Sequence, residues 1–311
     1  MRIGTRGSAL ALAQAGLIAE LLATAGHGGW QIVPMTTSGD RLSAASGDPS
    51  TDGSDKSRWV TELEDALADG RIDLAVHSAK DVPGELADGL ALHGAPARAA
   101  AEDVLCGAAA LDQLQMGARV GTSSIRRLAQ LQAARADLDV VAIRGNVDTR
   151  LRKLADPGEG LDAIVLAHAG LQRLTRESEV GGVLDVERFV PAPGQGVLAL
   201  EGRAGDDATS AAVEAITDKD TFACLVAERA VAQALDASCH TPLGAYAVPA
   251  GCGCLNLRSW VGLPDGSAWI SDELLGGFYD PQALGQRVAQ RMLAAGAGDL
   301  LRRADEMAAT K

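Results

Sequence analysis

The chain has 311 residues, and 28 Lys and Arg against 41 Asp and Glu give a net charge of −13, so a general nucleic-acid binder is not expected. The length predicts about two or three domains, and 47% hydrophobic with 22% charged residues is typical of a globular protein with a large core. No stretch approaches the roughly 20 apolar residues that cross a bilayer. The first residues lack an apolar secretion signal and the five cysteines are an odd number, so we expect a cytoplasmic protein.

Short β-like runs alternate with Ala- and Leu-rich helical runs in the first half of the chain, which is typical of α/β domains. The strands are expected at residues 2–5, 30–36, 73–77, 119–121, 140–143 and 163–167. The helices are expected at residues 8–25, 59–68, 124–134, 146–154 and 170–174. The last third predicts a smaller α+β domain, with strands at 255–262 and 267–272, a turn at 263–266 and a helix at 281–295.

The sequence contains a weak internal echo. Residues 3–8 and 120–124 both read as a strand, a tight turn and a Ser/Thr cap, and both precede a helix with a Leu-Ala-Gln triplet. Residues 73–76 and 162–165 are also alike. Two similar α/β domains would explain the echo, although turns of this kind are common to α/β folds. If the echo is real, two helix N-termini offer free N–H groups to an anion.

An arginine-rich segment stands out in this acidic chain. Residues 119–152 contain seven arginines against three aspartates, and guanidinium groups favour bidentate capture of carboxylate or phosphate. Two strand-to-helix turns concentrate these groups, and the alternative is a solvated face. The candidates in the two turns are Thr122, Ser123, Ser124, Arg126, Arg127, Arg144, Gly145 and Arg150.

A second polar segment, residues 77–83, follows directly on an apolar strand, where ligand crevices of open α/β sheets commonly lie. Its Asp81 is a carboxylate that Lys80 and nearby arginines can keep ionised, so it can bind an N–H, stabilise a cation or move a proton. Ser78 and Lys80 belong to the same segment. A surface turn is the alternative interpretation of this Lys-Asp pair.

Two further segments suggest function. Residues 42–57 are polar and aperiodic, and predict a surface loop that is either a linker or a lid, with Lys56 near its end. Cys239 lies in a turn next to His240, which favours either a nucleophilic thiol or an inert one. Cys252 and Cys254 are too closely spaced for a metal knuckle, so no metal site is expected.

Together these segments, in this order, resemble the porphobilinogen deaminase family. The resemblance runs over nearly the whole chain, and the ordered set is highly specific. The segments that carry it are residues 5–12, 77–83, 121–127, 144–151, 169–174, 193–196, 227–230 and 239–244.

The resemblance implies three domains and a covalent cofactor. The first two domains are alike and similar to type II periplasmic binding proteins, at residues 1–96 with 197–214 and at residues 100–193, and an α+β domain follows at 218–311. A dipyrromethane group made from substrate is attached by a thioether to the cysteine that matches Cys239. The implied partners are porphobilinogen and the growing oligopyrrole, with no nucleic acid and no membrane, and the family suggests a monomer.

The resemblance also implies a reaction. Four porphobilinogens are joined head to tail, each losing ammonia, and hydrolysis releases hydroxymethylbilane for tetrapyrrole and heme biosynthesis. Asp81 matches the catalytic aspartate, which stabilises the azafulvene cation that forms when ammonia leaves. Besides Cys239, the positions that match cofactor binding are Ser78, Lys80, Thr122, Ser123, Arg126, Arg127, Arg144 and Gly145. The positions that match substrate binding are Arg6, Ser8, Arg150, Arg173 and Gln195, the last at an interdomain hinge, and Lys56 matches the lid.

One alternative stays open at this point. A non-catalytic cytosolic anion-binding module would keep the same two-domain cleft without Asp81 chemistry or a cysteine adduct. If Arg127 only binds carboxylates, replacing it with Leu is expected to impair loading or elongation and to leave thermal stability nearly unchanged.

Overall fold

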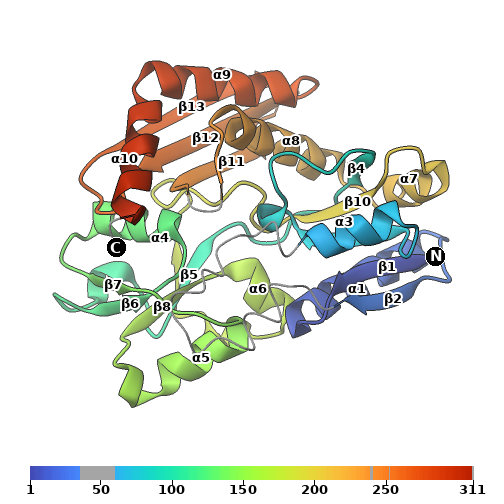
Figure 1. Ribbon diagram of the computed structural model, residues 1–311. Coiled ribbons are helices and arrows are strands. Elements are labelled where there is room, and N and C mark those ends of the chain that lie inside the picture. Colours follow the sequence, from blue (N-terminus) through green and yellow to red (C-terminus); the bar gives the residue numbers. More distant parts are fainter. Residues whose placement is uncertain (36–59, 239–240, 252, 310–311) are drawn as a thin grey trace. The chain divides into compact units, whose positions relative to one another are not determined.

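The computed structural model describes residues 1–35, 60–238, 241–251 and 253–309 of the chain. Three sheets organise these residues, two with five strands and one with three (Figure 1). The first two sheets are mixed and carry helices, and the third is antiparallel. The predicted class, two alike α/β domains with a smaller α+β domain, is therefore confirmed.

The first sheet has the order β2-β1-β3-β10-β4, in which β1 is parallel to β2 and β3, and β10 is antiparallel to both of its neighbours. Alternating side chains of β3 face opposite sides, so that Leu74 and Val76 pack with α1 and α7 while Ala75 packs with α3. The bounds are β1 Arg2–Arg6, β2 Gln31–Met35, β3 Leu74–Ser78, β4 Leu90–Gly94, β10 Leu198–Arg203, α1 Ala9–Thr24, α3 Thr61–Ala68 and α7 Asp207–Glu214.

The second sheet repeats this plan with the order β7-β6-β8-β5-β9. Here β6 is parallel to β7 and β8, and β5 is the antiparallel strand, in the place that β10 takes in the first sheet. The internal echo in the sequence therefore reflects two domains of one topology. The bounds are β5 Asp103–Cys106, β6 Arg119–Gly121, β7 Asp139–Val141, β8 Ala163–Ala167, β9 Gly182–Leu184, α4 Ile125–Ala134, α5 Val147–Ala155 and α6 His168–Arg173.

The third sheet is a meander, β11-β12-β13, with an apolar cluster between one of its faces and the last helices. Leu255 and Leu257 of β12 contribute to this cluster together with Leu284 and Val288 of α9. The bounds are β11 Leu243–Pro249, β12 Cys254–Gly262, β13 Trp269–Gly277, α8 Lys219–Ala234, α9 Pro281–Ala294 and α10 Ala297–Ala309.

The predicted elements agree with the structure to within one or two residues at most ends, and 119–121 and 163–167 match in full. The predicted strand 267–272 ends too early, because β13 pairs with β12 as far as Gly277 although Gly276 and Gly277 weaken the strand pattern. Strands β4, β5, β9, β10 and β11 and helices α7 and α10 were not predicted. Strands β5 and β10 are buried on both faces and therefore show no alternation.

Contacts divide the chain into two compact units. The first unit contains residues 1–99 and 197–222, and the second contains residues 100–196 and 223–311. The second unit thus holds both the second and the third sheet, and the three domain boundaries expected from the sequence stay a prediction. In the part of the chain that the structure describes, no helix is long and apolar enough to cross a membrane.

Candidate active site

In the first unit, Asp81 lies on a short turn at the end of β3. A single 3-10 turn, Ala79–Asp81, follows Ser78, and both Lys80 and Asp81 are half-buried. The Ala79 N–H donates to the carbonyl of Val197 at 3.0 Å, which fixes the turn to the residue that precedes β10. The carboxylate therefore stands at the carboxyl end of a buried strand, as the sequence predicts.

The start of α1 lies at the same edge, because β1 and β3 are parallel neighbours. Ser8 caps the helix, its Oγ accepting from the Ala11 N–H at 3.3 Å, and Arg6 ends β1 just before it. The Gln14 amide then donates to Ser78 Oγ at 2.9 Å, although Gln14 is buried inside the helix face. The fold thus brings Arg6, Ser8, Ser78 and the Asp81 turn to one edge of the first sheet.

In the second unit, the turn after β6 begins α4. Ser124 caps this helix by accepting from the Arg127 N–H at 3.5 Å, and Thr122 is buried with its N–H donating to Val141 at 2.9 Å. The Ser123 hydroxyl donates to the carbonyl of Ile143. These polar groups shape the turn itself, and the free N–H groups of the first helical turn stay directed out of the helix end.

The adjacent arginines of this turn both contact one carboxylate. Arg126 is 3% and Arg127 is 7% exposed, and both form ion pairs of 2.8 Å with Asp103 at the start of β5. Arg127 also donates to the carbonyl of Val165 at 3.0 Å, and Arg126 to that of Val190 at 2.9 Å. Since the turn looks like a surface site in the sequence, this burial was not expected.

Asp103 is a residue that the sequence reasoning missed. It is 1% exposed, and the charges of Arg126 and Arg127 hold its pKa well below the usual range against the opposing effect of burial. Its Oδ1 also accepts from the Gln195 amide at 2.9 Å. In the sequence Asp103 directly follows Glu102 and precedes a short apolar run, a pattern that is equally typical of the exposed start of a strand.

Two further arginines of the second unit are cations with no carboxylate partner among the described residues. Arg150 donates from Nε to the carbonyl of Gly145 at 2.8 Å, and Arg173 donates from Nη2 to that of Gly196 at 2.6 Å. Desolvation lowers the pKa of each to about 10, and the charge of Arg127 adds to the shift at Arg150. Partly buried guanidiniums that contact only carbonyl groups form a site that favours an anion.

Gly145 is required by the geometry of the second arginine turn. Its φ is +114°, and a Cβ there would lie 2.6 Å from the Thr149 side chain. Asn146 then caps α5 by accepting from the Thr149 N–H at 2.9 Å. Arg144 is exposed beside this turn. The turn therefore holds the Gly145 carbonyl where the Arg150 guanidinium reaches it.

The segment 193–196 is held by buried polar groups. Besides Asp103, the Gln195 amide donates to the carbonyl of Ala101 at 2.6 Å. The Gly194 N–H donates to the carboxylate of Glu228 in α8 at 2.6 Å, and the second oxygen of Glu228 accepts from Ala247 at 2.8 Å. Gln195 therefore lies where the chain leaves the second unit for the first.

Several predicted residues lie outside the described residues. They are Lys56 with the whole 42–57 loop, Cys239, His240 and Cys252. Cys106 and Cys224 are buried and Cys254 is half-buried, and the described residues contain no group of side chains suited to hold a metal ion.

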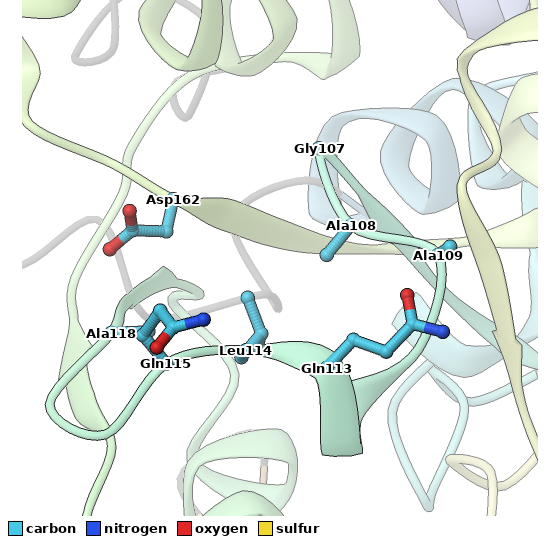
Figure 2. A pocket seen from close by; sticks show the side chains of 8 residues that line it. All are labelled: Gly107, Ala108, Ala109, Gln113, Leu114, Gln115, Ala118 and Asp162. Carbon is cyan, nitrogen blue, oxygen red and sulfur yellow. The ribbon is translucent and has the colours of Figure 1, made fainter.

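A surface hollow of about 340 Å³ lies elsewhere on the second unit (Figure 2). Figure 2 shows Asp162, Gln113 and Gln115 around it, together with Leu114 and four Gly and Ala residues. Asp162 precedes β8, so the hollow lies at the sheet edge opposite to the one that carries Arg126 and Arg173. It brings none of the predicted site residues together.

Comparisons with known proteins agree over the length of the chain. A family model described as "Porphobilinogen deaminase, dipyromethane cofactor binding domain" matches residues 1–211. A second model, "Porphobilinogen deaminase, C-terminal domain", matches residues 222–294.

Curated relatives carry the same name. The porphobilinogen deaminase of Xanthomonas euvesicatoria is 46% identical over 314 residues, covering 97% of this chain and 98% of the relative. The porphobilinogen deaminase of Brevibacillus brevis is 41% identical and covers 96% of each chain. That of Deinococcus deserti is 43% identical and covers 98% of each chain.

Solved structures show a weaker likeness. The immunogenic lipoprotein A of Vibrio vulnificus matches with a TM-score of 0.43 and 13% identity, covering 71% of this chain and 96% of that one. The periplasmic aliphatic sulphonate binding protein SsuA of Escherichia coli matches with a TM-score of 0.41 and 14% identity, covering 76% and 70%. At these scores the likeness carries no conclusion about function.

Proposed function

Because the chain belongs to the porphobilinogen deaminase family, we infer that it is a transferase, a hydroxymethylbilane synthase. It joins four porphobilinogen molecules head to tail with loss of ammonia and releases hydroxymethylbilane for tetrapyrrole and heme biosynthesis. The non-catalytic alternative is not supported, since relatives that span nearly the whole chain are named as deaminases.

The residues of the second unit fit a dipyrromethane cofactor, the group for which the matching domain is named. Such a group brings an acetate and a propionate on each ring, and Arg150 and Arg173 are desolvated cations with no described carboxylate partner. Arg126 Nε is likewise buried without a hydrogen-bond partner among the described residues. This excess of buried positive charge is the observation that carries the proposal.

When bound, the dipyrromethane group supplies the pyrrole carbon to which the first porphobilinogen is joined. We propose that Cys239 carries this group by a thioether. The residues that we propose to hold it are Arg126, Arg127, Arg144, Ser78, Lys80, Thr122, Ser123 and Gly145. Arg6, Ser8, Arg150, Arg173 and Gln195 then bind incoming substrate, and Lys56 acts in the lid.

We assign the electrostatic work to Asp81. As ammonia leaves porphobilinogen, the C–N bond breaks and the ring becomes electron-poor, and a carboxylate beside it lowers the energy of that cation. After the new C–C bond forms, the attacked pyrrole must lose its ring proton, which Asp81 can accept. The half-buried position of Asp81 supports this assignment, because partial exclusion of water strengthens the interaction.

Intact-mass measurement of the purified chain tests the proposal. We expect a mass above that of the polypeptide by one dipyrrole, together with a pink response to Ehrlich's reagent. Cys239→Ser is expected to abolish both, whereas the control Cys254→Ser keeps both. A bare polypeptide mass in freshly prepared, active enzyme would contradict the cofactor assignment.

Three finer points are proposals as well: a monomer, a cytoplasmic location and the absence of a nucleic-acid partner. The net charge of −13 supports the last of these. Light scattering of the purified chain, fractionation of expressing cells and a filter-binding assay with DNA and RNA test them in turn.

A further inference from the structure

The two adjacent arginines of α4 contact the same carboxylate, and each contacts a different one of its two oxygens. Arg127 donates to Asp103 Oδ1 from Nε at 3.0 Å and from Nη2 at 2.8 Å, and Arg126 reaches Oδ2 from Nη2 at 2.8 Å. Consecutive side chains on a helix diverge by about 100°. Convergence on one carboxylate therefore fixes the orientation of both guanidinium groups.

These contacts leave donors for a ligand. A guanidinium has five N–H groups. The bonds to Asp103 and Val165 use one N–H on each of three nitrogens of Arg127, and Arg126 Nε has no partner among the described residues. Asp103 thus consumes one of the two positive charges and leaves a net charge of about +1 with unused donors.

Gln195, which lies where the chain leaves the second unit, also contacts Asp103. Its buried amide donates both to Ala101 and to Asp103 Oδ1, so it supports the carboxylate that orients the arginines. The chain enters the first unit two residues later at Val197, whose carbonyl accepts from Ala79 in the Asp81 turn.

We propose that Asp103 is a positioning residue for carboxylate recognition, holding Arg126 and Arg127 in one geometry with the support of Gln195. The proposal rests on the function inferred above. In this role Asp103 weakens the general attraction of the two arginines for anions. In exchange, it fixes the orientation in which they bind the carboxylates of a pyrrole.

The test compares Asp103→Asn with Asp137→Asn, which alters an exposed bidentate pair with Arg135 at the other end of the same helix. The asparagine raises the net charge of the arginine pair from about +1 to about +2 while loosening its geometry. Since Arg126 and Arg127 are assigned to the cofactor, we expect the cofactor-loaded fraction of the folded chain to fall about tenfold. The sulfate concentration that half-inhibits loading of the folded, cofactor-free chain should fall about fivefold. Asp137→Asn is expected to leave both quantities unchanged.

A purely structural role would lower the Tm and the folded fraction and leave the loading of the remaining folded chain and its sensitivity to sulfate unchanged, and that result overturns the proposal. Asp103→Glu, which keeps the charge, is expected to recover part of the lost loading. If Asp103→Asn does not fold, Gln195→Leu is used instead, with a loss of loading of about threefold expected and unchanged loading counting against the proposal.

Thermal shift with sulfate separates this proposal from the proposed function. Sulfate is expected to raise the Tm of Asp103→Asn by several degrees more than that of the unaltered chain, whether or not either turns over porphobilinogen. Equal shifts overturn the role of Asp103, whereas a lack of turnover by the unaltered, loaded chain contradicts the function itself.

Discussion

The imidazole Nε2 of His77 lies 2.9 Å from Oε2 of Glu201, and both side chains are buried within the first unit. The register pairs His77 with Ala199 and Ala75 with Glu201, so the two residues are diagonal neighbours on β3 and β10. Glu64 of α3 belongs to the same group, since burial and the charge of Glu201 raise its pKa. Of these three residues, His77 lies in β3, the strand that leads into the Asp81 turn.

We therefore predict that His77→Ala destabilises the first unit strongly. It leaves the buried Glu201 carboxylate without the imidazole that lies against it, which costs about 1–3 kcal/mol of unfolding free energy. Urea denaturation at neutral pH measures the loss. The control Arg71→Ala breaks an exposed pair with Asp69 and is expected to cost less than about 1 kcal/mol. Equal effects of the two changes would show that the buried pair contributes nothing special.

Asp103 predicts a specific pH dependence of stability. Its pKa in the folded chain lies below the ordinary value of 3.8, so its contribution is fully present above pH 3.8. As the pH falls through 3.8, the unfolded chain takes up a proton that the folded chain does not, and the contribution is lost by up to about 1.4 kcal/mol per pH unit. The difference in unfolding free energy between the unaltered chain and Asp103→Asn should therefore be constant from pH 7 to 5 and shrink by pH 3. A difference that stays constant throughout would rule out the depressed pKa.

Local signals made much of this fold predictable. Ser8, Ser124 and Asn146 were each read at the start of a helix, and each caps one. The sequence similarity between the two α/β domains could be detected because a turn, a cap and a helix follow one another at the same spacing in both. Strands β5 and β10 were not predicted because both are buried on both faces and show no alternation. β10 also returns to the first sheet from a distant part of the sequence, since Leu198 pairs with Ser78, and nothing local records such a pairing.

The site was predictable as a set of residue types and less so as a set of contacts. Asp81 could be placed at a strand end from the sequence because the apolar run stops just before it. The partnership of Asp103 with Arg126, Arg127 and Gln195 spans up to 92 residues of chain, and only the folded structure brings these groups together. Sequence reasoning therefore assigned both arginines to a ligand and overlooked the internal carboxylate.

This contact changes the expectation for Arg127→Leu. The sequence alone suggested a change that leaves stability nearly intact, whereas the structure predicts the loss of a buried ion pair with Asp103. We now expect a loss of about 3–5 kcal/mol in unfolding free energy, together with poor cofactor loading. Calorimetry with intact-mass measurement checks both, and a Tm within a degree of the unaltered chain would contradict the structural role.

Arg150→Leu should behave in the opposite way. The Arg150 guanidinium is desolvated, its pKa is lowered to about 10, and it has no carboxylate partner among the described residues. A pKa that is lower in the folded chain means that the charged guanidinium destabilises folding. Removing it is therefore expected to leave the unfolding free energy of the cofactor-free chain unchanged or raised by up to about 1 kcal/mol. The KM for porphobilinogen should nevertheless rise about tenfold or more, because a carboxylate contact is lost. A destabilised variant with normal KM would place Arg150 among the structural residues.

Asp81→Ala provides the sharpest test of the chemistry. The carboxylate acts on charge that develops as ammonia leaves, so its removal should lower kcat by about 10²–10³-fold while porphobilinogen still binds. Asp81 is half-buried on a 3-10 turn, and the Ala79–Val197 bond that anchors this turn uses only backbone atoms, so Tm should change by no more than a few degrees.

Asp88→Ala, at an exposed position after the same strand, serves as the matched control and should keep full activity. Asp81→Glu is expected to retain more turnover than Asp81→Asn, because the charge matters more than the shape. Near-normal turnover by Asp81→Ala, with cofactor loading verified by mass, would move the catalytic carboxylate elsewhere in the chain.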